Sequence, residues 1–266
     1  MLDELANLEP FQIGDVTIHF EGFPSMTDGK TKKIWSEGKG YSSCYGCGAT
    51  YKELAKEWHP KFANLKPEAR SLALANCHLK ICCFKWLVKG CCARDYKSYS
   101  KVTLEEKASY ELNYEQMIED FKEQHPLKPK IKTTMLGNTG PIVKDVFKYP
   151  SVVADIMYCP ADLVEDLVVI FQTLDCGLPV DSQKFKAFTR DWLRRFHQSD
   201  IAWNWLSPTM HFIMHHGWEV LEFLPCGAGL LSEEGAEATN KWFRFNREHH
   251  ARQSSVEFNL LDCFTR

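Results

Sequence analysis

The chain has 266 residues, of which 44% are hydrophobic and 25% are charged, and its formal net charge is −3 at pH 7. A chain of this length and composition can bury a core of its own, which argues against extended disorder. The net acidity gives the chain as a whole no basic field that would attract nucleic acid. Any contact with DNA therefore has to come from local basic patches.

Composition also predicts the compartment. The N-terminal residues 1–14 carry acids where a secretory signal needs a basic start. The longest apolar run, residues 167–171, is far too short to span a bilayer. We therefore expect a nuclear or cytoplasmic protein without a membrane partner. In such a reducing compartment the 11 cysteines should be free thiols or metal ligands.

The first predicted element is a strand over residues 14–21, where apolar and polar side chains alternate with a period of two. Turn-forming residues 22–25 follow the strand. Asp28 then stands just beyond the strand end, where catalytic carboxylates often project. The next motif is Cys44-Tyr-Gly-Cys47, a tight turn that can direct two thiolates at one cation. Coincidence and packing remain the alternative for a single cysteine pair.

From Tyr51 onward the apolar pattern is helical almost to the end of the chain. Asp162 and Glu165 form a predicted capping box, and Ser207-Pro208 reads as an N-cap followed by the first helical residue. The proline- and lysine-rich residues 126–141 predict an extended connector. The expected helices cover approximately residues 72–90, 162–177, 182–196, 207–221 and 232–252.

A histidine-rich segment could supply the remaining ligands of a metal site. Helical geometry favours the pair His211 and His215, because residues four apart share a face. His211 and His216 are five apart and converge only if the helix is distorted or the metal lies at its edge. Capping or packing is the alternative for each histidine. The cysteines around residues 77–92 are interpreted as core packing rather than as a second metal cluster.

The C-terminal segment contains an acid followed by several cations. Glu237 precedes Lys241, Arg244, Arg247 and Arg252. An ion pair on a solvated helix is the simpler interpretation. The alternative is a metal-binding carboxylate beside a basic face that contacts DNA phosphates.

Three C-terminal runs, HFIMHH (211–216), LSEEGAEATNKWF (231–243) and HARQS (250–254), resemble the corresponding region of the catalytic subunit of V(D)J recombination and of Transib transposases. The segment CYGCGAT (44–50) is similar to the cysteine motif of that family. The order of the motifs is also the same: an aspartate, a CxxC pair, a histidine pair five apart, and a glutamate.

The resemblance implies a ligand set and a chemistry. Cys44, Cys47, His211 and His216 match the zinc-binding residues, which favours His216 over His215. Asp28 and Glu237 match two of the catalytic carboxylates that hold Mg²⁺ for DNA cleavage and strand transfer. The implied partners are DNA and a second copy of the chain or a longer transposase chain.

The implied fold is mainly helical with a small β element, in which a zinc-bound helical insertion interrupts a partial ribonuclease-H-like core. The expected division is a strand region with Asp28 (1–43), a zinc-binding helical insertion (44–225) and a C-terminal helix with Glu237 (226–266). The family's first catalytic aspartate lies far upstream of the second, and only 27 residues precede Asp28. Two hypotheses follow: a DDE-type recombinase that is catalytically incomplete alone, or a non-catalytic zinc-stabilised protein that binds DNA or protein.

Overall fold

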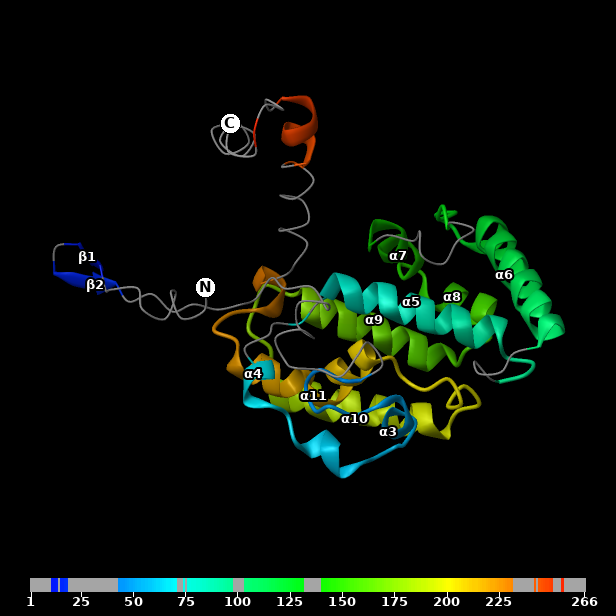
Figure 1. Ribbon diagram of the computed structural model, residues 1–266, viewed down its shortest axis with the longest axis horizontal. Helices are drawn as coiled ribbons and strands as arrows, with labels where there is room; N and C mark the ends of the chain where they lie inside the picture. Colours follow the sequence, from blue (N-terminus) through cyan, green and yellow to red (C-terminus); the bar gives the residue numbers. More distant parts are fainter. Residues whose placement is uncertain are drawn as a thin grey trace.

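The computed structural model describes residues 11–13, 15–18, 43–70, 74, 76–97, 103–131, 140–231, 242, 244–250 and 255, and these are mostly helical (Figure 1). Residues 244–249 form a short helical stretch. The remaining elements are β1 (Phe11–Ile13), β2 (Val16–Ile18), α3 (Tyr51–Leu54), η1 (Pro60–Ala63), α4 (Pro67–Arg70), α5 (Asn76–Cys92), α6 (Leu104–Gln124), α7 (Gly140–Val146), α8 (Pro150–Met157), α9 (Ala161–Asp175), α10 (Ser182–Gln198), α11 (Pro208–Phe223) and η3 (Ala228–Leu231).

The expected partial ribonuclease-H-like core is wrong for the part of the chain that the structure describes. There the only sheet is the antiparallel pair β1–β2, in register from Phe11↔Ile18 to Ile13↔Val16. Alternation at residues 14–21 indicated a strand correctly, but periodicity in one segment carries no information on how many partner strands exist. Two strands of three residues are too small to form the core of a domain. The helices supply the core instead.

Helix α5 lies at the centre of this core and packs against α6, α7, α8, α9 and α11. Its side chains Leu79, Phe84 and Leu87 are almost completely buried. In Figure 1, α5 runs beside α9 through the middle of the molecule. A helix that buries side chains against so many neighbours must be apolar over most of its surface. This explains why α5 contains several cysteines, which pack as small apolar groups.

An aromatic cluster joins α5 to α10. Trp192 and Phe196 stack with ring centroids 5.4 Å apart, and Trp86 meets Phe196 edge-on at 5.5 Å. The Trp86 indole nitrogen donates a hydrogen bond of 2.6 Å to the carbonyl of Asn204, whose side-chain amide donates back to the Trp86 carbonyl at 2.8 Å. Each buried polar group of this pair thus has a partner. The cluster therefore positions α10 and the segment that leads into α11.

Local capping defines several helix boundaries. Ser207 caps α11 as predicted, because its hydroxyl accepts a hydrogen bond from the Met210 backbone nitrogen at 3.3 Å. The capping box predicted at Asp162 is wrong. Helix α9 begins at Ala161 after Pro160, and the Asp162 carboxylate contacts Arg195 of α10 instead. A tertiary ion pair thus replaces the local contact that the sequence pattern suggested.

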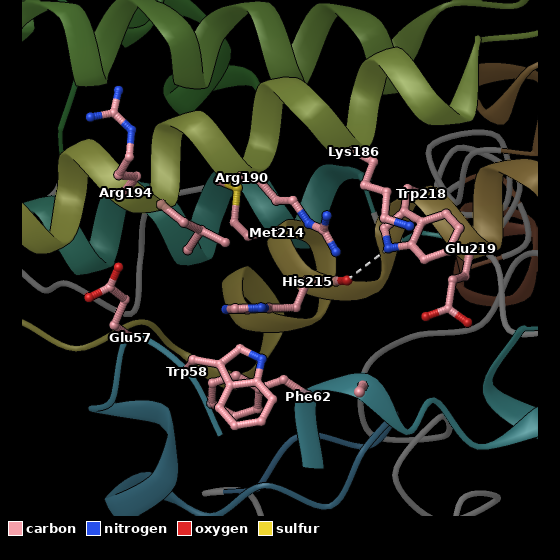
Figure 2. A pocket seen from close by; sticks show the side chains of 12 residues that line it. Glu57, Trp58, Phe62, Lys186, Arg190, Arg194, Met214, His215, Trp218 and Glu219 are labelled. Atoms are coloured by element: carbon pink, nitrogen blue, oxygen red, sulfur yellow. Dashed lines mark hydrogen bonds between the residues drawn. The ribbon is translucent and has the colours of Figure 1, made fainter. Parts of the chain in front are cut away.

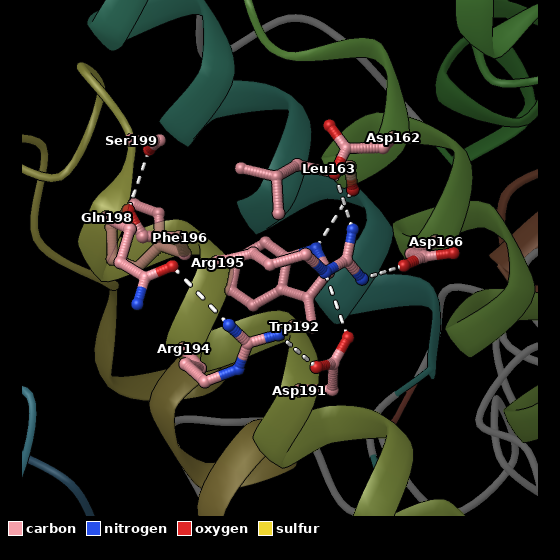
Figure 3. A network of polar contacts seen from close by, with 10 residues as sticks. All are labelled: Asp162, Leu163, Asp166, Asp191, Trp192, Arg194, Arg195, Phe196, Gln198 and Ser199. Atoms are coloured by element: carbon pink, nitrogen blue, oxygen red, sulfur yellow. Dashed lines mark hydrogen bonds and ion pairs between the residues drawn. The ribbon is translucent and has the colours of Figure 1, made fainter.

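Arg195 of α10 contacts three carboxylates, of which the two on α9 connect the helices (Figure 3). Its guanidinium donates to Asp191 at 2.9 Å, to Asp162 at 2.6 Å and to Asp166. Asp166, Asp162 and Asp191 all raise the pKa of Arg195, so it stays charged. The side chain of Arg195 is only 25% exposed, so water screens these contacts less than it screens an ordinary surface pair.

We predict that Arg195→Gln destabilises the protein by about 1–3 kcal/mol, because it leaves carboxylates of α9 without their cation. Arg194→Gln is the matched control, since Arg194 is exposed and hydrogen-bonds only within α10, to Asp191 and Gln198. Its effect should be much smaller. Urea unfolding followed by circular dichroism measures both. Equal midpoints for the two variants would contradict the interhelical role of Arg195.

Candidate metal centre

The two cysteines lie on a tight turn at residues 43–50. Ser43 and Thr50 form an isolated antiparallel bridge at its base. The Cys44 backbone nitrogen donates to the Ala49 carbonyl at 2.8 Å, and the Gly48 nitrogen donates to the Cys44 carbonyl at 2.8 Å. Gly48 has a φ of +70°, a conformation that glycine adopts without steric cost. This closed turn directs both sulfurs to one side.

The turn packs directly onto α11. The Tyr45 ring lies 4.1 Å from the Phe212 ring. A Cβ atom added at Gly46 would lie 2.6 Å from Phe212 and 2.8 Å from Leu65, closer than side-chain atoms approach one another. Glycine at this position therefore allows the backbone of the turn to lie against the helix.

Helix α11 provides the two histidines. His211 and His216 are 1% and 0% exposed, and both are covered by the turn and its surroundings. Their ring centroids lie 5.4 Å apart, so residues five apart do converge at the edge of a regular helix. The helix need not be distorted, because long imidazole side chains reach around the edge toward the sulfurs.

Cys44, Cys47, His211 and His216 come together in one cluster that could hold a metal ion. Their ligand atoms all lie within 4.8 Å of one another. The Cys47 sulfur and His211 Nε2 are 3.5 Å apart. The four residues expected to bind the metal thus lie together in a group that could hold one. The rings of His211 and His215, the pair that helical spacing favoured, lie 4.4 Å apart, but the ligand atoms that converge with the two sulfurs are those of His211 and His216.

Electrostatic interactions within the cluster shift the pKa values of its side chains. A hydrogen bond from the Cys44 thiol, together with His211 and His216, lowers the pKa of Cys47 to about 2 against the opposing effect of burial. Burial raises the pKa of Cys44. Burial opposes the protonation of His216, yet the neighbouring Cys47 sulfur and Glu219 carboxylate raise its pKa.

His216 gives the sharpest indication that a ligand belongs here. Neither of its ring nitrogens has a hydrogen-bond partner among the described residues, although the side chain is fully buried. Its Nδ1 is 3.9 Å from the Glu219 carboxylate, beyond hydrogen-bond distance. Leaving such a group unsatisfied costs about 1–3 kcal/mol. A cation bound by an imidazole nitrogen would satisfy it, so the residues present fit a metal ion.

Glu219 supports the cluster from outside. It lies between His216 and Arg70, with an ion pair of 3.0 Å to Arg70. His216 and Arg70 together lower the pKa of this carboxyl. A carboxylate next to a ligating histidine orients the ring and raises its basicity. Arg70 comes from α4, so this contact also fastens α4 to α11.

Of the other predicted site residues, the structure describes only Arg244 and Arg247. Asp28, Glu237, Lys241 and Arg252 lie outside the described residues. Arg244 and Arg247 are exposed on the helical residues 244–249.

The cysteines of α5 do not form a second cluster in the ranges that the structure covers. The only group able to hold a metal there is the one described above. Cys83 is fully buried and Cys82 only partly, so the apolar stripe of α5 includes Cys83 rather than Cys82. Burial raises the pKa of Cys83. The interpretation of these thiols as core packing is consistent with both findings.

A cavity of about 540 Å³ beside the cluster was missed by sequence reasoning (Figure 2). It lies between the segment 57–63, α10 and α11, and His215 is part of its wall. Burial lowers the pKa of His215 to about 2, so its ring is neutral. The signal in the sequence is the row Lys186, Arg190 and Arg194, four residues apart on one face of α10.

No protein-family model matches the chain, and no curated protein matches it. None of the described helices combines the length and the apolar character needed to cross a membrane.

We predict that Gly46→Ala destabilises the protein by about 1–3 kcal/mol and weakens metal binding, because the new methyl group collides with Phe212. The double variant Gly46→Ala/Phe212→Leu should recover part of this loss, so that the two changes are not additive. Thermal unfolding and metal titration of the single and double variants measure this coupling. Strict additivity would show that the turn does not pack on Phe212.

Proposed function

We propose that this chain is a zinc-stabilised, DNA-acting protein of the transposase and recombinase class. The observation that carries the proposal is the buried cluster of Cys44, Cys47, His211 and His216. The same four residues match the zinc ligands of the V(D)J recombinase and Transib family, whose motifs occur here in the same order. The convergence of a family pattern and a geometric cluster on one ligand set supports both parts of the proposal.

Zinc fits the donor set better than other common divalent ions. Two thiolates and two imidazoles are a frequent ligand set for structural zinc, whereas Mg²⁺ selects oxygen ligands. Zinc bonds of about 2.0–2.3 Å place tetrahedral ligand atoms about 3.3–3.8 Å apart. The 4.8 Å limit of the cluster therefore requires only small side-chain shifts to reach this geometry. All four positions would be filled by protein atoms, so the ion would stabilise the fold rather than perform catalysis.

We predict one zinc ion per chain. His216→Ala should abolish stoichiometric zinc, because three ligands form a weaker and open site. His215→Ala is the matched control, since this neighbouring histidine packs outside the cluster and its loss should leave the zinc content unchanged. Metal analysis of purified protein measures both. Loss of zinc in His215→Ala with retention in His216→Ala would contradict the ligand assignment.

The DNA-acting part of the proposal rests on the C-terminal segment. Arg244 and Arg247 are exposed on one short helical stretch, and Lys241 and Arg252 flank it in sequence. Because the chain has a net charge of −3, phosphate contacts must be concentrated in such a patch. Asp28 and Glu237 are the proposed carboxylates for Mg²⁺, and DNA cleavage by two metal ions would need a further carboxylate.

A second candidate function is a non-catalytic zinc-stabilised protein that binds DNA. The carboxylates favour it, because only Asp28 and Glu237 match the Mg²⁺ ligands of the family and two-metal cleavage needs a further carboxylate. Mg²⁺-dependent cleavage that Glu237→Gln abolishes without changing zinc content would support the enzyme. Binding of duplex DNA without cleavage, also after a partner chain has been added, would support the non-catalytic DNA-binding protein.

We predict that Arg244→Gln/Arg247→Gln weakens duplex DNA binding similarly at all sequences and lowers the salt slope by about 2, because two phosphate contacts are lost. Lys122→Gln/Lys148→Gln removes two exposed cations from α6 and from the segment after α7, and serves as the control. Fluorescence anisotropy at several salt concentrations measures both. Equal weakening in the two double variants would show that only net charge matters.

A further inference from the structure

The cavity beside the metal cluster has the size and lining of a ligand site. Its volume of about 540 Å³ lies within the range of pockets for small molecules and cofactors. Its walls come from the segment that follows α3, from α10 and from α11. Basic, acidic and aromatic side chains line it together, so a purely apolar ligand would leave charged groups buried without partners.

One wall is basic. Lys186, Arg190 and Arg194 follow one another at four-residue spacing on α10. Arg194 is held by Asp191 at 2.7 Å, and the Lys186 ammonium lies 3.3 Å from the centre of the Trp218 ring. Arg190 forms no ion pair or hydrogen bond with any residue that the structure describes. Figure 2 shows its guanidinium pointing into the cavity, where it can donate to an anion.

The opposite wall is aromatic. Trp58 is 64% exposed, and Figure 2 shows its ring across the cavity from Arg190. Phe62 is buried beneath it and contacts His215, so the base of this wall is rigid. A large ring exposed at the mouth of a basic cavity provides a flat surface on which a planar ligand can stack.

The acidic residues of the cavity leave room for an anion at Arg190. Glu219 is already engaged by Arg70 at 3.0 Å, which offsets its charge. In Figure 2, Glu57 lies across the cavity from Lys186. Its carboxylate can therefore accept a hydrogen bond from an amino group without facing the anion.

We propose that this cavity binds a nucleoside phosphate, with the phosphate on Arg190 and Lys186 and the base against Trp58. The inference rests on the proposed DNA-acting function and adds a site for a single nucleotide unit, separate from the basic segment 241–252. The source of that unit is a free nucleotide or one residue of a single strand. The shared chemistry is an anionic phosphate joined to a planar, hydrogen-bonding ring.

The test uses the zinc-loaded full chain with dAMP, adenosine, inorganic phosphate and a short single-stranded oligo-dA as probes. We expect dAMP to bind at least tenfold more tightly than adenosine or phosphate alone, because only dAMP contacts both walls. Arg190→Gln and Trp58→Ala should each weaken binding about tenfold. Lys122→Gln and Leu112→Ala on α6 are matched controls for a lost cation and a lost exposed apolar side chain. Isothermal titration calorimetry measures all of them.

The outcomes distinguish a free nucleotide from a single strand as the ligand, and they test the pocket separately from the proposed function. Tighter binding of oligo-dA than of dAMP, lost in Arg190→Gln and Trp58→Ala, assigns the site to a single strand. Binding of dAMP alone assigns it to a free nucleotide. The inference is overturned if neither dAMP nor oligo-dA binds at millimolar concentration. It is also overturned if the pocket variants and the control variants bind with equal affinity. Zinc content and duplex binding are measured on the same samples. If the chain holds zinc and binds duplex DNA but does not bind dAMP, only the proposed pocket is disproved. If it binds dAMP but neither holds zinc nor binds duplex DNA, only the proposed function is disproved.

Discussion

The burial of two thiols and two imidazoles at one point is the constraint on which the rest of the structure depends. Cys44, His211 and His216 are buried, and Cys47 half-buried, by the same packing that places Phe212 under the turn. Buried polar groups without partners cost free energy, so the packing is favourable only if something satisfies them. A cation shared by all four would do so, and it would be held by α11, which packs on α5 and α10.

Helix α11 uses its consecutive histidines for two different purposes. His211 and His216 face the turn, while His215 faces the cavity that Arg190 and Trp58 also line. His215 and His216 are adjacent residues of one helix, so the metal cluster and the cavity lie on neighbouring faces of α11.

The sequence indicated the parts of the site that depend on local chemistry. The CxxC turn and the Ser207 cap follow from residue types at fixed short spacings. The choice of His216 over His215 came from the resemblance, because helical spacing cannot show how a distant turn approaches the helix edge. The ribonuclease-H-like core and the Asp162 capping box failed for a related reason. Strand partners and the Arg195 ion pairs are set by tertiary packing, which no local period encodes.

The ligands of the cluster are separated by a long stretch of chain, since Cys47 and His211 are 164 residues apart. Contacts of such high sequence separation form late in folding, because the entropy of closing the loop must be overcome first. A proteolytic cut between Cys47 and His211, followed by separation of the fragments, would divide the ligands two and two. Neither fragment would then retain a tetrahedral set, so tight metal binding would require both parts of the chain.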